Sequence, residues 1–411
     1  MHRRVFQIAI LLFLQVALVL GPWAGPAAAL TPEQQLLSEA WRIVNRSYVD
    51  DKFNSKNWWS IREKAVKQPL NDRQQTYTAI QGMLANLDDP FTRLLKPEQY
   101  RSLQVNTSGE LTGVGLQIAI DPQTNTLTVV APLAGSPADK AGIQPLDRIL
   151  KIDGTPTSEL SLDEAATRMR GRIGTPVTLT LGREGRDAAE EIKLVRDRIA
   201  LNPVYAELQS PDNLPVGYIR LSQFSANATE EVARAIDRLE KQGAAAYILD
   251  LRNNPGGLLQ AGIEIARLWL DSGTIVYTVN RQGILGSFEA SGQALTGDPL
   301  IVLVNKGTAS ASEILAGALQ DNGRAQLVGE KTFGKGLIQS LFDLSDGSGL
   351  AVTVAKYETP NHTDINKLGI SPDRVVPLEP IARDQIGTAA DLQYQAALQL
   401  LKETTVLAKS V

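Results

Sequence analysis

The chain has 411 residues, a formal net charge of −4 from 41 Lys and Arg against 45 Asp and Glu, and 43% hydrophobic residues. This length is enough for two or three domains with sizeable cores. The slight acidic excess argues against a nucleic-acid partner, whose binding needs a basic face. Cysteine is absent, which excludes a disulfide framework and leaves serine as the first candidate for a nucleophile.

The N-terminal segment has the pattern of a secretory signal peptide. Two arginines precede an apolar run over residues 5–20, and small residues follow up to Ala29. The alternative is an uncleaved anchor, but the run contains Gln7 and Gln15 and falls short of the roughly 20 residues that span a bilayer. We therefore expect export and cleavage after about Ala29.

Residues 30–105 are predicted to form a helical N-terminal domain. Thr31 has the position of an N-cap, Pro32 would be the first helical residue, and Gln34 would complete a capping box. Apolar residues then recur at helical spacing in two segments, the second of which ends at the Asp-Asp-Pro sequence of residues 88–90.

From about residue 108 the apolar residues follow the shorter period of β-strands. A glycine-rich stretch at 113–118, a Pro-Ala-x-x-Ala-Gly helix at 137–142 and a strand closed by Asp-Gly at 153–154 follow one another. This pattern resembles a PDZ domain, a small β-barrel with two helices, which we place at residues 106–198. The alternative is a small barrel with a glycine turn.

A PDZ domain implies a binding site for a protein C-terminus. Successive backbone N–H groups around Gly115 can bind a terminal carboxylate, and the adjoining strand can add an extended peptide to the sheet. Arg170 ends the predicted binding helix and is a candidate sensor of ligand occupancy, the alternative being a solvated arginine. The predicted peptide-binding residues are Val114, Gly115, Leu116, Gln117 and Ile118.

Strands alternate with helical segments in the rest of the chain, which predicts an α/β layer structure over residues 199–411. A terminal helix is expected at residues 391–401. The predicted fold class is therefore a multidomain α+β protein that contains a helical N-terminal domain, a PDZ domain and an α/β core. In that core the residues capable of catalysis follow the ends of strands.

Ser310 follows the strand predicted at residues 300–304, after a turn at Gly307, and stands at the start of the next helix. A nucleophile in this position is exposed by the turn, and the helix N-terminus stabilises developing negative charge. The alternative is ordinary N-capping by Ser310 or Ser312. Taken alone, this segment leaves both interpretations open.

The strand predicted at residues 246–251 leads into an Arg-Asn-Asn-Pro sequence that precedes Gly256 and Gly257. Paired glycines allow backbone N–H groups to point into a site. The N–H groups of Gly256 and Ala311 are therefore candidates for an oxyanion hole. The alternative is a glycine-rich turn between a strand and a helix.

Lys335 lies between two glycines, with the apolar residues Phe333 and Leu337 nearby. A general base must be neutral near pH 7, and desolvation lowers a lysine pKa in that direction. A change from about 10.4 to about 7.5 costs roughly 4 kcal/mol. Gln339 is placed to orient the amine, as the third group of a triad does. The alternative is a solvated lysine in a turn.

The histidines offer no other catalytic system. His2 lies in the signal segment, and His362 lies in a polar loop where we expect it at the surface. No cluster of His, Asp or Glu has metal-ligand spacing, so neither a metal nor another cofactor is predicted. The glycines around Lys335 also lack the spacing of a phosphate-binding loop.

Together these motifs resemble the carboxyl-terminal processing proteases, a family of tail-specific serine peptidases. The resemblance runs from about residue 36 to residue 373. It implies Ser310 as the nucleophile, Lys335 as the base, Gln339 as its support, and the N–H groups of Gly256 and Ala311 as oxyanion donors. The matching motifs lie at residues 87–93, 252–257, 307–313, 334–336 and 364–367, in addition to the PDZ segment.

The N-terminal block resembles the cyanobacterial and chloroplast branch of this family, which removes a C-terminal extension from the precursor of the photosystem II reaction-centre protein. The resemblance implies such a precursor tail as partner, on a membrane-associated substrate, in the thylakoid lumen or periplasm. General tail-specific degradation in the periplasm and a PDZ scaffold without catalysis are the alternatives. The sequence indicates no oligomeric state.

Overall fold

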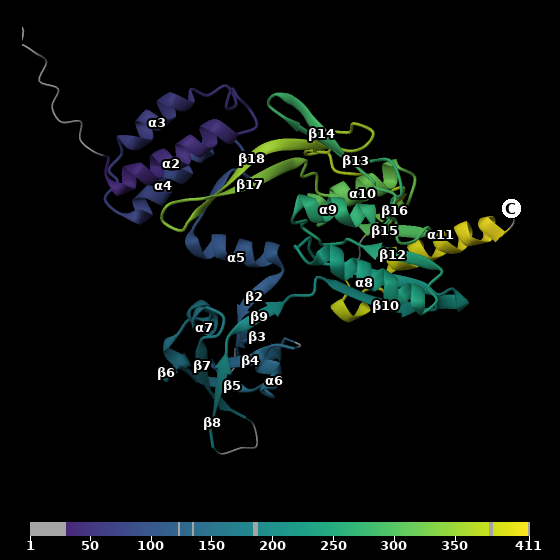
Figure 1. Ribbon diagram of the computed structural model, residues 1–411, viewed down its shortest axis with the longest axis horizontal. Helices are drawn as coiled ribbons and strands as arrows, with labels where there is room; N and C mark the ends of the chain where they lie inside the picture. Colours follow the sequence, from purple (N-terminus) through teal and green to yellow (C-terminus); the bar gives the residue numbers. More distant parts are fainter. Residues whose placement is uncertain (1–29, 122–123, 134, 184–187, 378–380, 410–411) are drawn as a thin grey trace, which may run out of the picture.

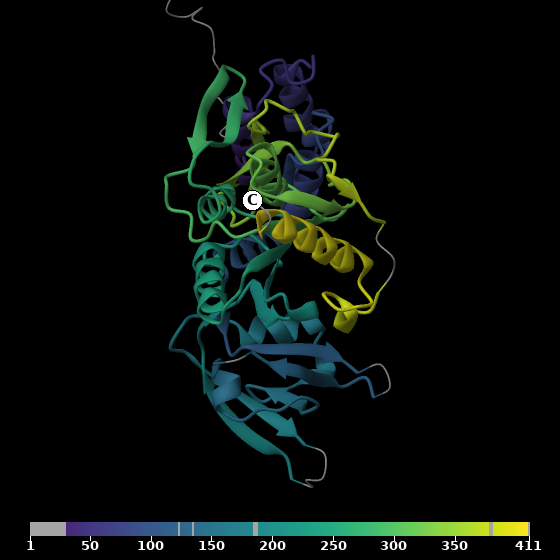
Figure 2. The same cartoon turned by 90° about the vertical axis from the view of Figure 1, so that its right-hand side faces the viewer.

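The computed structural model describes residues 30–121, 124–133, 135–183, 188–377 and 381–409 (Figure 1). The predicted signal peptide lies outside the described residues. Three groups of elements follow one another: N-terminal helices, a small barrel at one end of the molecule, and a larger α/β body (Figures 1 and 2). The predicted fold class is confirmed. Within the described ranges, no helix is long and apolar enough to cross a bilayer.

The N-terminal helices share one apolar core with a later β-hairpin. These elements are α2 (Pro32–Ser47), α3 (Trp58–Val66), α4 (Arg73–Ala85), β17 (Leu337–Asp343) and β18 (Gly349–Glu358). The capping box predicted at Thr31 is formed, because its side chain accepts the N–H of Gln34. Leu344 and Leu350 of the hairpin lie in the same buried cluster as Trp41 of α2. The helices therefore depend on a partner from the far end of the sequence.

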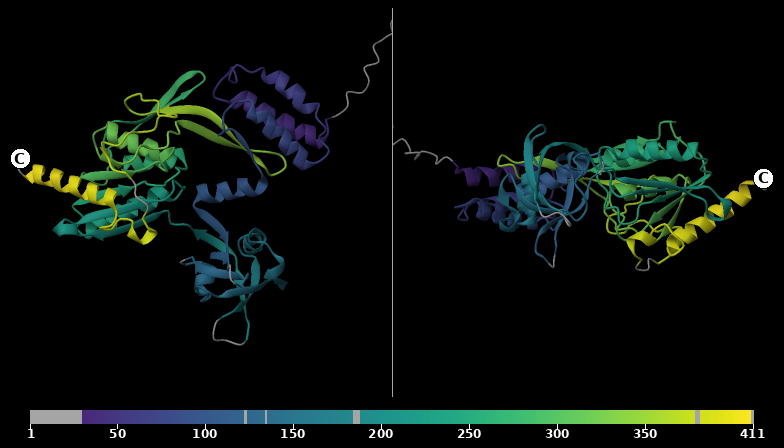
Figure 3. Two further views of the ribbon diagram at one scale, coloured as in Figure 1. Left: turned by 180° about the vertical axis from the view of Figure 1, so that it is seen from behind. Right: turned by 90° about the horizontal axis from the view of Figure 1, so that it is seen from below.

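Strands β17 and β18 form a long antiparallel ribbon between the α/β body and the N-terminal helices (Figures 1 and 3). At its far end the hydroxyls of Tyr77 and Tyr100 donate to Asp346 and Asp343, each at 2.7 Å. The other strands of this sheet are β1 (Arg93–Leu95), β13 (Thr274–Asn280) and β14 (Gly283–Glu289). The ribbon thus connects the helices to the segment that contains Lys335.

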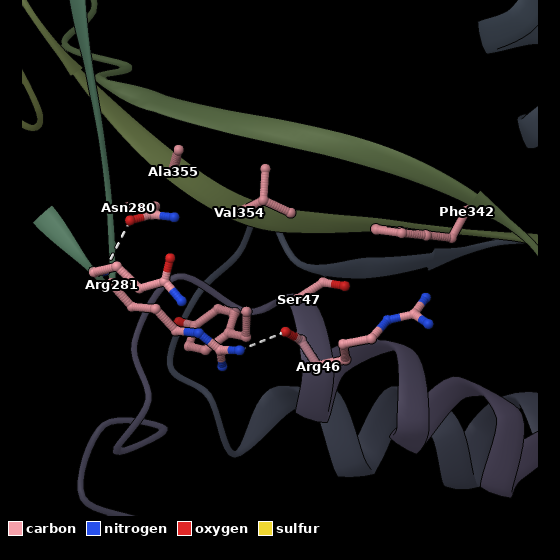
Figure 4. A pocket seen from close by; sticks show the side chains of 9 residues that line it. Arg46, Ser47, Asn280, Arg281, Phe342, Val354 and Ala355 are labelled. Carbon is pink, nitrogen blue, oxygen red and sulfur yellow. Dashed lines mark hydrogen bonds between the residues drawn. The ribbon is translucent and has the colours of Figure 1, made fainter. Parts of the chain in front are cut away.

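A second contact joins the N-terminal helices to the β13–β14 hairpin. A hollow of about 320 Å³ lies between the end of α2 and the turn of that hairpin (Figure 4). The Arg281 guanidinium donates to the carbonyl of Arg46 at 2.8 Å, and the ribbon residues Phe342 and Val354 line the other wall. None of the predicted catalytic residues lines this hollow.

The small barrel has the two helices expected of a PDZ domain. The strand order of its sheet is β3-β4-β5-β7-β8, which places β3 at an edge. The chain enters through β2 and leaves through β9, and these two strands pair as an antiparallel neck. Its elements are β2 (Glu110–Gly113), β3 (Leu116–Ile120), β4 (Leu127–Pro132), α6 (Pro137–Lys140), β5 (Arg148–Ile152), β6 (Thr155–Pro156), α7 (Leu162–Met169), β7 (Pro176–Gly182), β8 (Glu190–Val195) and β9 (Asp197–Ala200), and α5 (Pro97–Ser108) precedes it.

The α/β body is built on a six-stranded sheet of order β10-β11-β12-β15-β16-β19. Its elements are β10 (Val204–Gln209), β11 (Val216–Leu221), α8 (Ala228–Lys241), β12 (Ala246–Asp250), α9 (Leu259–Arg267), β15 (Leu300–Val304), α10 (Ala311–Asp321), β16 (Gln326–Gly329), β19 (Arg374–Val375) and α11 (Leu392–Lys409). Alternate residues face opposite layers, so Leu249 packs toward α8, α9 and α10 while Ile248 packs toward α11. Strand β10 runs antiparallel to β11, and the remaining strands are parallel. Both faces are covered, as the parallel part of the sheet requires.

The order of the parallel strands brings the predicted catalytic loops together. Strands β12 and β15 are neighbours and run in the same direction, with Leu249 opposite Val302. Their carboxyl ends therefore lie at the same edge of the sheet, which is where open α/β sheets bind ligands. The glycine loop follows β12 and the Ser310 turn follows β15, so the two loops meet at that edge.

Candidate active site

A cavity of about 480 Å³ lies at this edge of the sheet. All five predicted catalytic and oxyanion residues line it: Ser310, Lys335, Gln339, Gly256 and Ala311. Apolar residues make up most of the remaining wall, and one charged residue, Arg93 of β1, comes from the N-terminal part of the chain. The cavity is therefore shared between the α/β body, the β17–β18 ribbon and the N-terminal region.

The turn at Ser310 places its side chain at the start of α10. Its backbone has φ 58° and ψ −119°, a conformation that is costly for a residue with a side chain and recurs at functional sites. In the described chain the Ser310 hydroxyl makes no capping hydrogen bond to α10. The Glu313 carboxylate accepts the N–H of Ser310 at 2.9 Å instead, and the Ser312 hydroxyl donates to the carbonyl of Asn254 at 3.0 Å. Ser310 thus stands at the N-cap position of α10, where its N–H and the Glu313 carboxylate form one half of a capping box.

The glycine loop packs directly against this turn. A Cβ atom added to Gly256 would lie 2.6 Å from the carbonyl oxygen of Ala309 and 2.9 Å from the nitrogen of Ala311, and its φ is +94°. Only glycine fits at this position. The N–H of Gly256 donates to Asn254 Oδ1 at 2.9 Å, so in this conformation one predicted oxyanion donor is engaged within the loop. The N–H of Ala311 has no partner among the described residues.

A buried ion cluster anchors the base of the glycine loop. The Arg252 guanidinium is 4% exposed and bonds both Asp250, at the end of β12, and Asp391, which precedes α11. Asp250 also accepts the hydroxyl of Tyr218 at 2.7 Å. Because these charges satisfy one another, the loop begins from a fixed point. Arg252, the first residue of the 252–257 motif, therefore stabilises the start of the glycine loop.

Glu313 ties the serine segment to the lysine segment and was not among the predicted site residues. Its fully buried carboxylate accepts the N–H groups of Ser310, Gly334 and Lys335 at 2.9, 2.7 and 2.9 Å, and also the hydroxyl of Thr332. Four donors satisfy a charge that would be very unfavourable if buried alone. A sequence signal was present, since glutamate three residues after a serine is the capping-box pattern.

The Lys335 amine lies over the ring of Phe91 in this conformation. Its Nζ lies 5.2 Å from the centre of the Phe91 ring, in a cation–π arrangement. No hydrogen bond joins Lys335 Nζ to Ser310 Oγ within the part of the chain that the structure describes. The main chains of the predicted nucleophile and base are therefore joined, while their side chains are not paired.

The surroundings of Lys335 favour its neutral form. Burial lowers the pKa of Lys335 below its ordinary value, and the nearby Arg93 guanidinium lowers that pKa further. The carboxylates of Glu313 and Asp89 act in the opposite direction. The net direction is the one that a general base near neutral pH requires.

Gln339 lines the cavity but contacts Thr353 instead of Lys335. Its Nε2 lies 3.5 Å from the hydroxyl of Thr353, which donates to Asp89 at 2.7 Å. Asp89 also accepts the hydroxyl of Thr92 at 2.7 Å. Gln339 therefore points toward a polar cluster of the N-terminal segment, and its predicted contact with the lysine amine is not formed in this conformation.

The predicted peptide-binding residues lie at the edge of the barrel. Strand β3 pairs with β4 alone, so its other edge is available within the described sheet. The side chain of Val114 is buried in the barrel core. Gly115 has φ +78° and lies against Ser136, where a Cβ would approach to 2.2 Å. Arg170 is the C-cap residue of α7. It is exposed and lies beside Gly113.

His362 lies at the surface, as expected from the sequence. Its side chain is 53% exposed, contacts Glu358 at 3.0 Å and stacks on Tyr277. It does not line the catalytic cavity. Across the described ranges, no group of three or more His, Asp or Glu side chains is arranged to hold a metal ion.

Known proteins show the same combination of parts. The model of peptidase family S41 matches residues 215–376, and a PDZ-domain model matches residues 128–183. The carboxyl-terminal-processing protease of Picosynechococcus sp. is 62% identical over 97% of this chain and 96% of its own length. The carboxyl-terminal-processing protease of Synechocystis sp. is 64% identical over 97% of this chain and 93% of its own length. A solved photosystem II D1 C-terminal processing protease is 44% identical, covers 84% of this chain and 94% of that chain, and has a TM-score of 0.55.

The fold, the cavity and these similarities define a serine-type peptidase with a PDZ domain. The chain belongs to the carboxyl-terminal processing proteases of peptidase family S41. The family assignment agrees with the resemblance seen in the sequence.

Proposed function

We propose that Ser310 is the nucleophile and Lys335 the general base of this peptidase. The observation that carries the proposal is that both residues line one cavity while Glu313 bonds the main-chain N–H of each. The Ser310 hydroxyl attacks the scissile carbonyl, and the Lys335 amine accepts its proton and passes it to the leaving amine of the tail. Water then hydrolyses the acyl-enzyme, with the amine again as base.

The N–H groups of Gly256 and Ala311 stabilise the oxyanion in this proposal. Ala311 begins α10, so the positive end of the helix dipole adds to its N–H. The N–H of Gly256 must exchange its bond to Asn254 for one to the substrate. Lys335 must likewise leave the Phe91 ring, after which Gln339 orients its amine. The described conformation is therefore a resting state that substrate binding converts.

The barrel selects the substrate by its C-terminus. We propose that the tail pairs with the open edge of β3 and that the backbone between Val114 and Ile118 binds the terminal carboxylate. Leu116, Gln117 and Ile118 would supply side-chain contacts, whereas the buried Val114 would act through its backbone. The exposed Arg170, which lies beside Gly113, is the proposed sensor of an occupied groove.

The proposed substrate is the precursor of the photosystem II reaction-centre protein. Support comes from the cyanobacterial relatives and from the similarity to a photosystem II D1 C-terminal processing protease. The proposed location is the thylakoid lumen or periplasm, reached through a signal peptide that is cleaved after about Ala29. We also propose the functional division into residues 30–105, 106–198 and 199–411.

The test uses the purified protein and a substrate that carries the C-terminal extension of the reaction-centre precursor. Ser310→Ala should lower the cleavage rate by roughly a thousandfold or more. Ser312→Ala, whose hydroxyl bonds Asn254, should lower it by less than about tenfold. Continued cleavage by Ser310→Ala would overturn the assignment of the nucleophile. Equal cleavage of an unrelated protein with an apolar tail would replace precursor maturation by general tail degradation.

A further inference from the structure

Tyr357 places one hydroxyl group between the two predicted catalytic segments. It lies on β18, is 1% exposed and forms part of the wall of the catalytic cavity. Its hydroxyl is 3.0 Å from the carbonyl oxygen of Ser310 and 2.5 Å from the carbonyl oxygen of Lys335. Both neighbours are acceptors, so the single hydroxyl proton is shared between them. Burial raises the pKa of Tyr357, so the hydroxyl keeps that proton.

On the serine side, this hydroxyl acts on the peptide unit that joins Ser310 to Ala311. A trans peptide is planar, so its carbonyl and its N–H point in opposite directions. The Ser310 carbonyl accepts the N–H groups of Glu313 and Ile314 and the hydroxyl of Tyr357. Three donors to one carbonyl hold the plane and polarise it, which makes the N–H of Ala311 a better donor. That N–H is the proposed oxyanion donor without a partner among the described residues.

On the lysine side, the same hydroxyl bonds the main-chain carbonyl of Lys335, whose N–H is already bonded by Glu313. Glu313 accepts its N–H at 2.9 Å, and Tyr357 donates to its carbonyl. The N–H of Tyr357 also donates to the carbonyl of Gly336 at 3.1 Å. These bonds hold the main chain on both sides of the Lys335 side chain.

We propose that Tyr357 is a positioning residue for the reaction: its hydroxyl holds the carbonyl groups of Ser310 and Lys335 in register, so that the oxyanion donor and the base are preset relative to each other. This proposal rests on the proposed roles of Ser310 and Lys335. Within the described chain, the Tyr357 hydroxyl is bonded to two main-chain carbonyl groups and to none of the proposed reacting atoms. Its effect should therefore appear in the rate of the chemical step while substrate affinity is unchanged.

The test compares Tyr357→Phe with Tyr247→Phe in the full-length protein. Tyr247 is a matched control in the same α/β body, since it is also fully buried and its hydroxyl donates to Glu240 at 2.9 Å. Cleavage of the tailed precursor gives kcat and KM for both variants, referred to the folded fraction measured by circular dichroism. We expect Tyr357→Phe to lower kcat roughly tenfold with KM within about twofold, and Tyr247→Phe to leave both within about twofold.

The outcomes separate this inference from the proposed function. If Ser310→Ala is inactive and Tyr357→Phe keeps its kcat, the positioning role is wrong and the nucleophile assignment stands. An equal loss of kcat in both tyrosine variants would also overturn the role, since it would reflect stability alone. A change confined to KM would do the same. If Ser310→Ala cleaves normally, the proposed function fails and the positioning role fails with it.

Discussion

The two sides of the proposed catalytic cavity are built in different ways. The Ser310 side belongs to the α/β body, where Ala311, Leu315 and their neighbours on α10 are almost fully buried. The Lys335 side uses the N-terminal segment, because the amine rests on Phe91 and is near Arg93. The proposed nucleophile therefore depends on local packing, whereas the proposed base depends on contacts between distant parts of the chain. Changes far from the serine should act mainly through the lysine.

The largest effect is expected from removing the proposed base. Lys335→Ala should lower kcat by roughly a hundredfold to ten-thousandfold, which is the usual contribution of a general base. Lys331→Ala is the matched control, because Lys331 is an exposed lysine in the same segment and should retain full activity. Cleavage of a tailed substrate measures both. Similar cleavage rates for Lys335→Ala and Lys331→Ala would mean that Lys335 has no catalytic role.

Glu313→Gln should break the link between the two sides. The neutral amide accepts hydrogen bonds more weakly than the carboxylate, and its NH₂ group faces the N–H donors that the charge now satisfies. We expect the free energy of unfolding to fall by about 2–3 kcal/mol and kcat to fall by roughly tenfold or more. Glu358→Gln, at the surface contact with His362, is the control. Stability is measured by urea unfolding and activity by the cleavage rate. Equal stability and equal rates in Glu313→Gln and Glu358→Gln would contradict the link.

Arg93→Gln should shift the pH dependence of the reaction. The Arg93 guanidinium disfavours a second positive charge nearby, so its removal raises the pKa of Lys335. The neutral, active form of the base then appears only at higher pH, and the ascending limb of kcat/KM against pH moves in the alkaline direction. Arg148→Gln, in the barrel, should leave the profile in place. A shift toward acid in Arg93→Gln would contradict the proposed electrostatic coupling.

The smallest effect is expected from Phe91→Leu. Leucine keeps the apolar contact but removes the ring face that attracts the ammonium group, an interaction of about 0.5–1 kcal/mol. Because the ring favours the charged, displaced lysine, kcat/KM should rise by about two- to fivefold near neutral pH. Phe342→Leu, beside the Figure 4 hollow, makes the same substitution away from the cavity. A fall in activity would mean that Phe91 assists the base.

Much of the fold could be predicted because its signals are local. The capping box at Thr31, the glycine pattern of the barrel and the alternation of strands and helices each lie within a short stretch of sequence. The strand ends likewise led to Ser310 and Gly256, since parallel neighbours bring their carboxyl ends together. The apolar period of α2 indicated a buried face. It could not indicate that the ribbon, some 300 residues later, covers that face.

The groups that the sequence did not reveal act over long separations. Tyr357 contacts the carbonyl of Ser310 across 47 residues, and it lies in a strand whose apolar pattern explains a buried aromatic residue without reference to catalysis. Asp89 reaches Thr353 across 264 residues. Glu313 is the exception, because its spacing of three residues from Ser310 is that of a capping box. No local pattern indicates its contact with Lys335.

The shared core of the N-terminal helices and the β17–β18 ribbon has a consequence for how the protein loses its structure. Leu344, Leu350 and Trp41 belong to one buried cluster, so neither the helices nor the ribbon can be exposed to water alone without losing that burial. The barrel has a separate cluster and is joined by its two-stranded neck. On heating, the helices and the α/β body should therefore melt as one cooperative unit, while the barrel melts independently.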